Sequence, residues 1–125
     1  MAIRILIADD DETLIQALAV LFEMNGYIAS TATSVGLAIS LLNDESFDCL
    51  VFNLKIGSAS GEEILWHLGV DSIESPPGVI IAMSDGVPDL ELQRFRDMVT
   101  NVLVRPFSFE DLLSEVNWHL RRISR

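Results

Sequence analysis

The sequence is poor in residues that bind metals through nitrogen or sulfur, with two histidines and one cysteine in 125 residues. One cysteine excludes a disulfide within the chain. Cys49 lies in the apolar run Cys49–Phe52, which predicts a buried and unreactive thiol. His67 and His119 are far apart and have no second ligand at a useful spacing, so the sequence argues against a zinc site.

Basic residues are also scarce: eight lysines and arginines stand against nineteen aspartates and glutamates, for a net charge of -11. Such a surface repels phosphate backbones, so we expect no nucleic-acid binding by this domain, although the same charge also favours solubility. No apolar run reaches the roughly 18 residues of a membrane span. The opening Met1–Arg4 lacks the layout of a secretory signal. The sequence therefore predicts a cytoplasmic domain with no membrane partner.

What the sequence does contain is a globular composition, half of it hydrophobic, and a regular alternation of two patterns. Short apolar runs predict five strands: Ile3–Ala8, Tyr27–Thr31, Asp48–Asn53, Val79–Met83 and Asn101–Val104. Amphipathic stretches predict five helices: Glu12–Asn25, Val35–Asn43, Gly61–Leu68, Leu90–Met98 and Phe109–Ile123. Strict alternation predicts a single α/β domain over residues 1–125, with a doubly wound parallel sheet flanked by helices.

Local signals support several of these boundaries. Ser60 and Ser108 each stand three residues before a carboxylate, which is typical of a capped helix start. The pair Asn25-Gly26 suits a left-handed turn at a helix end. In a doubly wound fold, functional residues collect beyond the carboxyl ends of the strands, so the candidate site residues are those that follow the predicted strands.

The first predicted strand is followed by four consecutive carboxylates, Asp9–Glu12. A cation would relieve their mutual repulsion, and Mg²⁺ prefers carboxylate oxygens. Acidic residues are equally typical of the first turn of a helix, where they suit the helix dipole. Asp9 and Asp10 fit the cation role, and Asp11 and Glu12 fit the dipole role.

Two other strand ends bring polar groups to the same rim. Asn53 ends the third strand, and Arg105 directly follows the last one. Arg105 places a permanent positive charge at the rim that carries the acidic pair. The alternative is an arginine that makes an ordinary surface ion pair.

Taken together, these segments resemble the receiver domains of response regulators, and the resemblance covers the whole chain. Ile5–Asp11 resembles the acidic opening motif of that family, Phe47–Leu54 its phosphoacceptor strand, and Val102–Ser108 its closing Lys-Pro-Phe signature. The resemblance implies a flavodoxin-like sheet of strand order 2-1-3-4-5. It also implies a Mg²⁺ ion at the acidic pair and a strand-end aspartate that accepts a phosphoryl group from a histidine kinase.

Carried over by position, the metal ligands would be Asp9, Asp10, Asn53 and the backbone carbonyl of Lys55. The other working positions depart from the family. Asn53 stands where the phosphoacceptor aspartate belongs. The remaining departures are Met83 at the phosphate-binding hydroxyl, with Ser84 one residue late, Arg105 for lysine, Val102 for the aromatic switch, and Gly57 for a proline.

These departures predict a domain that has left the phosphorelay. A neutral amide is a far poorer nucleophile toward phosphorus than a carboxylate. Methionine has no hydroxyl that hydrogen-bonds a phosphoryl oxygen, and valine has no ring to swing between exposed and buried positions. Because guanidinium forks onto carboxylates, we hypothesise that Arg105 pairs with Asp9 or Asp10 and eases the repulsion there in place of a cation.

The sequence therefore predicts a non-enzymatic signalling domain that acts through protein–protein contact. The resemblance implies a surface formed by the fourth helix, the last strand and the fifth helix, with Phe95, Val102 and Trp118 as candidate contacts. Its partners would be a histidine kinase, an output domain, or a second copy of the chain in a homodimer. The basic end Arg121–Arg125 is typical of a helix that runs into a linker, as in the N-terminal part of a longer protein.

Two alternatives accompany this prediction. The first is a conventional Mg²⁺-dependent phosphoacceptor whose aspartate was replaced by Asn53, or one that uses Ser84 or Asp10. The second is a small flavodoxin-like nucleotide or flavin binder, although the sequence has no glycine-rich phosphate loop after the first strand.

Overall fold

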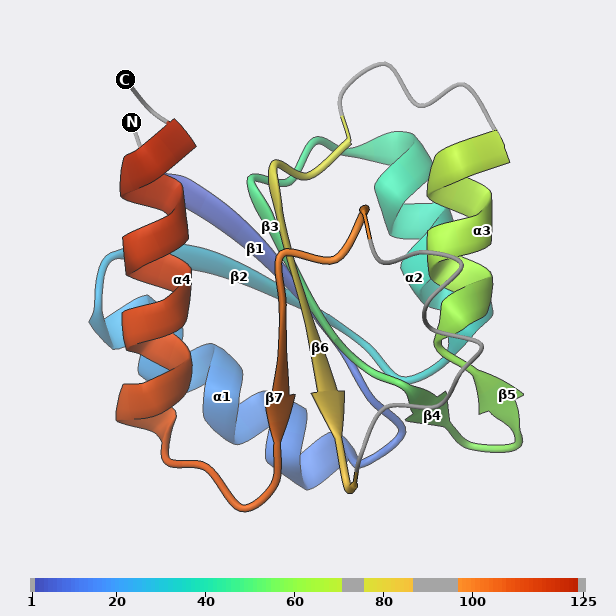
Figure 1. Cartoon of the computed structure of the whole chain (residues 1–125), viewed down its shortest axis with the longest axis horizontal. Coiled ribbons are helices and arrows are strands. Elements are labelled where there is room, and N and C mark those ends of the chain that lie inside the picture. The colour runs from blue at the N-terminus through green and yellow to red at the C-terminus, as the bar shows by residue number, and fades with distance from the viewer. Residues whose placement is uncertain (1, 71–75, 87–96, 124–125) are drawn as a thin grey trace.

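The computed structural model describes residues 2–70, 76–86 and 97–123, which form a parallel sheet between two layers of helices (Figure 1). The sheet has the strand order β2-β1-β3-β6-β7, and every neighbouring pair is parallel. Counted along the chain, this is the predicted order 2-1-3-4-5. The strands are β1 (Ile3–Ala8), β2 (Tyr27–Ala32), β3 (Cys49–Asn53), β6 (Val79–Ser84) and β7 (Asn101–Val104).

Helices cover both faces of this sheet (Figure 1). Helices α1 (Glu12–Met24) and α4 (Phe109–Ile123) pack on one face, and α2 (Val35–Asp44) and α3 (Glu62–Val70) pack on the other. The helix predicted over Leu90–Met98 lies outside the described residues, except for Asp97 and Met98, which form a turn. In the part of the chain that is described, no helix has the length and apolar character needed to cross a membrane.

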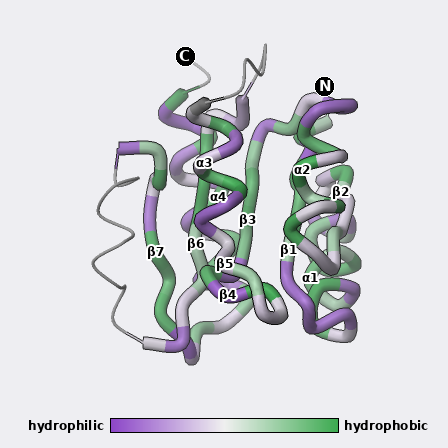
Figure 2. Tube along the Cα trace, turned by 90° about the vertical axis from the view of Figure 1, so that its right-hand side faces the viewer, coloured by the Kyte–Doolittle hydropathy of each residue, from purple (hydrophilic) through white to green (hydrophobic). Residues whose placement is uncertain are grey.

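Successive residues of the central strands point to opposite faces, which builds two cores. Ile5 and Ile7 of β1 pack with α1 and α4, whereas Leu6 and Ala8 pack with α2 and α3. Strands β1, β3 and β6 are therefore buried on both faces, which explains their nearly continuous apolar sequences. In Figure 2 the hydrophobic residues follow β3 and β6 through the interior of the molecule.

The predicted signals at Ser108 and at Asn25-Gly26 are confirmed, whereas Ser60 Oγ accepts from the Glu62 amide at 3.2 Å. The Asp111 amide donates to Ser108 Oγ and the Ser108 amide donates to Asp111 Oδ2, each at 3.1 Å, which is a reciprocal cap at the start of α4. Gly26 has a φ of 90°, as the predicted left-handed turn requires. The predicted third helix is confirmed, with its start one residue later, at Glu62, and its end two residues later, at Val70.

A two-stranded antiparallel hairpin, β4 (Lys55–Ile56) and β5 (Ala59–Ser60), follows β3 and was not predicted. Strands of two residues have no periodicity that a sequence pattern reveals. Its turn contains Gly57 with a φ of 62°. Proline cannot adopt a positive φ, which explains the glycine at this position. The hairpin stands beside the carboxyl edge of the sheet (Figure 1).

Candidate functional site

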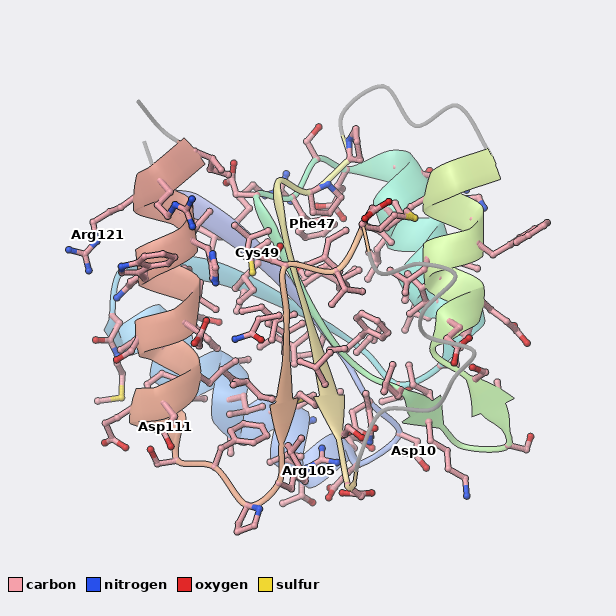
Figure 3. All side chains as sticks on the ribbon, viewed as in Figure 1. Asp10, Phe47, Cys49, Arg105, Asp111 and Arg121 are labelled. Atoms are coloured by element: carbon pink, nitrogen blue, oxygen red, sulfur yellow. The ribbon has the colours of Figure 1, made fainter. Side chains whose placement is uncertain are left out.

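The carboxyl ends of the strands bring together the predicted polar residues at one rim of the sheet. Figure 3 shows Asp10, after β1, and Arg105, after β7, at the same edge of the molecule. Asn53 ends β3, the strand that pairs with β1, so its side chain reaches Asp9 although 44 residues separate the two. The structure therefore places most of the predicted site residues in one neighbourhood.

The centre of this rim is the Asp9 carboxylate, which is 1% exposed. Its Oδ2 atom accepts a hydrogen bond from Asn53 Nδ2 at 3.2 Å and another from Arg105 Nη2 at 3.1 Å. Its Oδ1 atom accepts from the Asp11 backbone amide at 3.3 Å. Buried carboxylates need such partners because the loss of water is otherwise uncompensated. Three N–H donors therefore satisfy a charge that has almost no contact with solvent.

Asn53 is held at both ends of its amide. While Nδ2 donates to Asp9, the Oδ1 atom accepts from the backbone amide of Lys55 at 3.2 Å. An aspartate in the same place would put another carboxylate beside the buried Asp9. The amide thus replaces a repulsive contact with an attractive one, because it donates where a carboxylate only accepts.

Arg105 joins three strand ends. Its Nη2 atom contacts the buried Asp9, and its Nη1 atom contacts Oδ1 of the exposed Asp85 at 2.9 Å. The hypothesis of a pair with Asp9 or Asp10 is therefore confirmed for Asp9. The surface ion pair is present too, through Asp85, which the sequence analysis missed. The signal was available, since Asp85 directly follows β6 as Asp9 directly follows β1.

The pKa of Asp9 is raised above its ordinary value, and burial is the main cause. The neighbouring Asp10 carboxyl raises it further. The Asp11 amide, the Asn53 amide and the Arg105 guanidinium each act in the opposite direction, since they stabilise the ionised form. The charge on Asp9 thus depends on donors that the chain itself supplies.

The two residues predicted near a phosphate do not present a hydroxyl there. Met83 is fully buried and packs in the core between the sheet and helices α1 and α4. Ser84 is 7% exposed, and its Oγ donates to the Gly86 carbonyl at 2.7 Å and accepts from the Gly86 amide at 3.2 Å. The Ser84 hydroxyl is therefore engaged in a local turn.

The backbone at Gly61 lies very close to the Asn53 carbonyl and the Phe52 ring at the end of β3. A Cβ atom added to Gly61 would lie 2.2 Å from the Asn53 carbonyl oxygen and 2.8 Å from Cδ2 of Phe52. Only glycine allows the start of α3 to pack this tightly against the strand end. Gly61 thus positions Asn53 indirectly, and the sequence analysis did not assign it that role.

The candidate contact residues have different environments. Val102 is partly buried and packs against the core beneath α2 and α3. Trp118 is 53% exposed on α4, with the Arg122 guanidinium 4.6 Å from its ring centre. Phe95 lies outside the described residues. Trp118 is therefore exposed, whereas its role in an interface stays a prediction.

The residues at the predicted metal position do not fit a divalent cation well. Both carboxylate oxygens of Asp9 already accept N–H donors, and Oδ1 of Asn53 accepts from Lys55. Mg²⁺ needs oxygen lone pairs directed at it, and nitrogen donors in the same place oppose this. Within residues 2–70, 76–86 and 97–123, no cluster of three or more His, Cys, Asp or Glu side chains is arranged to hold a metal ion.

Solved structures share this fold over nearly the whole chain. A CheY-like response regulator receiver domain protein from Methanospirillum hungatei matches with a TM-score of 0.81 and 23% identity, covering 98% of this chain and 96% of that one. A response regulator from Burkholderia pseudomallei with a phosphorylated aspartic acid, calcium ion and citrate matches with a TM-score of 0.77 and 22% identity, covering 98% and 71%.

Sequence relatives give the same assignment. The chain is 22% identical over 125 residues to the nisin biosynthesis regulatory protein NisR of Lactococcus lactis, covering 100% of this chain and 53% of NisR. It is 26% identical over 118 residues to the phosphate regulon transcriptional regulatory protein PhoB of Pseudomonas aeruginosa, covering 94% and 52%. It thus spans about half the length of these relatives. The sequence profile of the response regulator receiver domain matches residues 5–117, and the chain belongs to this family of two-component signalling.

Proposed function

We propose that this receiver domain transmits signals through protein–protein contact and does so without phosphorylation of an aspartate. The observation that carries the proposal is Asn53, whose amide is bonded at one end to Asp9 and at the other to the Lys55 backbone. The position that delivers the family's phosphoacceptor thus holds a neutral amide in a closed hydrogen-bond network. An amide is a far poorer nucleophile than a carboxylate.

The surroundings of Asn53 support the same proposal. Met83 is buried in the core, and the Ser84 hydroxyl bonds to Gly86, so neither side chain is oriented to bind a phosphoryl oxygen at Asn53. The cation of Arg105 is already shared between Asp9 and Asp85. A phosphoryl group would have to compete with both carboxylates for that guanidinium.

The contact surface that we propose lies between β7 and α4. An open groove of about 920 Å³ runs along these two elements and includes the exposed Trp118 in its lining. This surface contains the last strand and the final helix, as the resemblance implied. We propose a histidine kinase, an output domain or a second copy of the chain as its partner. NisR and PhoB are about twice as long as this chain, which supports an output domain as one of these partners.

The proposal also covers the setting of the domain. We propose that it acts in the cytoplasm as a non-enzymatic module, and that DNA contact, if the full protein has any, is made by another domain. The net charge of -11 supports the last point because it repels phosphate backbones.

The decisive test exposes the purified domain to acetyl phosphate or beryllofluoride with Mg²⁺, followed by intact mass spectrometry and amide NMR. We expect no covalent phosphate, and no change of amide shifts around Asn53 relative to a sample that contains the same Mg²⁺ and no phosphodonor. The matched variant is Asn53→Asp, which changes only the reacting group. A receiver domain with an aspartate at this position, treated in parallel, shows that the phosphodonor is active.

A stable phosphate on the unaltered chain, located on Asp10 or Ser84 and accompanied by a change in partner affinity, would overturn the proposal. This result would favour the conventional alternative, for which the exposure of Asp10 is the supporting observation. The neighbour from Burkholderia pseudomallei, with its phosphorylated aspartic acid, shows that the same fold supports that chemistry in another chain.

A further inference from the structure

We propose that the Arg105 guanidinium takes the place of a divalent cation at Asp9, so that this rim does not bind Mg²⁺ at millimolar concentration. The inference goes beyond the proposed function, because a domain that accepts no phosphate can still bind a metal. Three features support this inference: the contacts of Asp9, the anchoring of Arg105 and the permanent charge of the guanidinium.

Both oxygens of the Asp9 carboxylate already accept hydrogen bonds. Arg105 and Asn53 donate to Oδ2 at 3.1 and 3.2 Å, and the Asp11 amide donates to Oδ1 at 3.3 Å. These donors use three of the roughly four lone-pair sites of the carboxylate, which leaves little of Asp9 for a cation. A cation at Asp9 would also stand close to a guanidinium of the same sign, and like charges repel.

Arg105 is anchored on both sides. Its two terminal nitrogens contact different carboxylates, Asp9 and Asp85, and its backbone amide donates to the Ser84 carbonyl at 2.8 Å. The side chain therefore cannot swing away from Asp9 without also breaking the ion pair with Asp85 or distorting it. An arginine held in this way is organised before any ligand arrives.

The positive charge of Arg105 is permanent. Guanidinium does not lose its proton in proteins, and its planar fork presents several N–H groups at fixed angles. A bound metal comes and goes with its concentration, whereas this cation is part of the chain. The rim therefore keeps its internal cation at every Mg²⁺ concentration, and a change of Mg²⁺ concentration is not a signal to which it responds.

The test uses Mn²⁺ as a paramagnetic probe in place of Mg²⁺, with NMR relaxation of the amides around Asp9 and Asn53 as the readout. For the unaltered domain we expect no saturable broadening at the rim. For Arg105→Ala and Arg105→Gln we expect saturable broadening, with an affinity at least about tenfold higher, because the Asp9–Asp10 pair then lacks its internal cation. Arg105→Gln retains an N–H donor, so it separates the effect of charge from that of hydrogen bonding.

Arg4→Ala is the matched control. Arg4 also forms an ion pair, with Glu45, but it lies near the start of β1, at the other end of that strand. Its removal changes the net charge by the same amount and should leave the rim without Mn²⁺ binding. A second readout is thermal unfolding with and without Mg²⁺. The melting temperature should rise with Mg²⁺ in the Arg105 variants alone, because ligands that bind the folded state stabilise it.

Saturable Mn²⁺ binding to the unaltered domain that disappears in Asp9→Asn would overturn the inference. Failure of both Arg105 variants to gain binding would also overturn it, provided that their amide spectra show a folded domain. If neither variant folds, the measurement on the unaltered domain still decides the question. A negative phosphodonor test with positive Mn²⁺ binding would refute this inference and leave the proposed function standing.

Discussion

Asp9 shows how single side chains set the properties of the rim. The carboxyl is buried, and burial together with Asp10 raises its pKa, while the Arg105 guanidinium and two N–H donors lower it. An acid whose pKa is raised by folding contributes stability that is fully present below its unfolded pKa. That contribution is lost as the pH rises through the folded pKa. The donors around Asp9 limit this loss at neutral pH.

Arg105→Ala should therefore raise the pKa of Asp9 further. The reason is that the variant removes the only guanidinium bonded to Asp9 among the described residues, and this guanidinium lowers the pKa of Asp9. The carboxyl carbon resonance of Asp9, followed by NMR against pH, measures the shift. Arg122→Ala is the control, since the Arg122 guanidinium stacks on Trp118 of α4. An unchanged Asp9 titration in Arg105→Ala would contradict the assigned pair.

Tyr27 provides a pH dependence that is independent of the rim. Its hydroxyl bonds to Asn117, and burial, with a smaller effect from Cys49, raises its pKa from 10.0 to about 12. Folding therefore favours the neutral phenol. This contribution to stability is fully present below pH 10 and is lost as the pH rises to 12, at about 1.4 kcal/mol per pKa unit.

The prediction for Tyr27 is easily measured because the chain has a single tyrosine. The absorbance of tyrosinate in the folded domain should rise with a midpoint near 12, or together with alkaline unfolding above pH 10. In concentrated urea the midpoint should return to about 10. A native midpoint at the unfolded value would show that the phenol is not buried as described.

At the scale of elements, the junction between β3 and α3 is the most demanding packing contact at the rim. Gly61→Ala should lower the free energy of unfolding by about 1–3 kcal/mol, because the new methyl group overlaps the Asn53 carbonyl and the Phe52 ring. The amide resonances of Asn53 and Lys55 should shift as well. Urea denaturation and amide NMR provide the two measurements.

Gly36→Ala is the matched control in the other helix of the same layer. Gly36 lies in α2, and among the described residues no atom outside its chain neighbours and its own helix backbone lies within 4 Å of the Cβ position that the substitution creates. Alanine in a helix restricts the unfolded chain more than glycine does, so this variant should gain about 0.4–1 kcal/mol. Equal effects of the two substitutions would mean that the close approach at Gly61 is not a constraint.

Some helices and strands of this chain could be predicted from the sequence, and others could not. Strands β1, β3 and β6 and helix α4 were predicted within one residue because long apolar or amphipathic runs specify them. The hairpin of β4 and β5 was missed because a strand of two residues is too short to show an alternation of apolar and polar residues. Met83 was assigned to the phosphate position by its place in the chain, but pleating turns its side chain into the core.

At the scale of the whole molecule, the reactivity of the Cys49 thiol depends on whether the sheet is folded. The thiol is fully buried in β3, between β1 and β6, and burial, with a smaller effect from Asp48, raises its pKa. Because the thiolate is the reactive form, Ellman's reagent should react with Cys49 only through global unfolding. The reaction rate against urea concentration should follow the unfolding curve.

A suitable control for the thiol experiment is the double variant Cys49→Ala, Ser114→Cys. Ser114 is exposed on α4, so a thiol at that position should react at once in the native protein. Rapid reaction of Cys49 in the unaltered domain would mean that the central strands open locally without global unfolding.

The sequence by itself determined the alternation of elements, the two buried faces, the helix caps and the burial of Cys49, because periodicity and capping depend on residues close together in the chain. Only the tertiary structure decided that Arg105 pairs with Asp9 and Asp85, that Asn53 donates to Asp9, and that Ser84 turns to Gly86. Arg105 and Asp9 are 96 residues apart. Their contact follows from the way in which parallel pairing aligns strand ends, and from side-chain directions that no local pattern encodes.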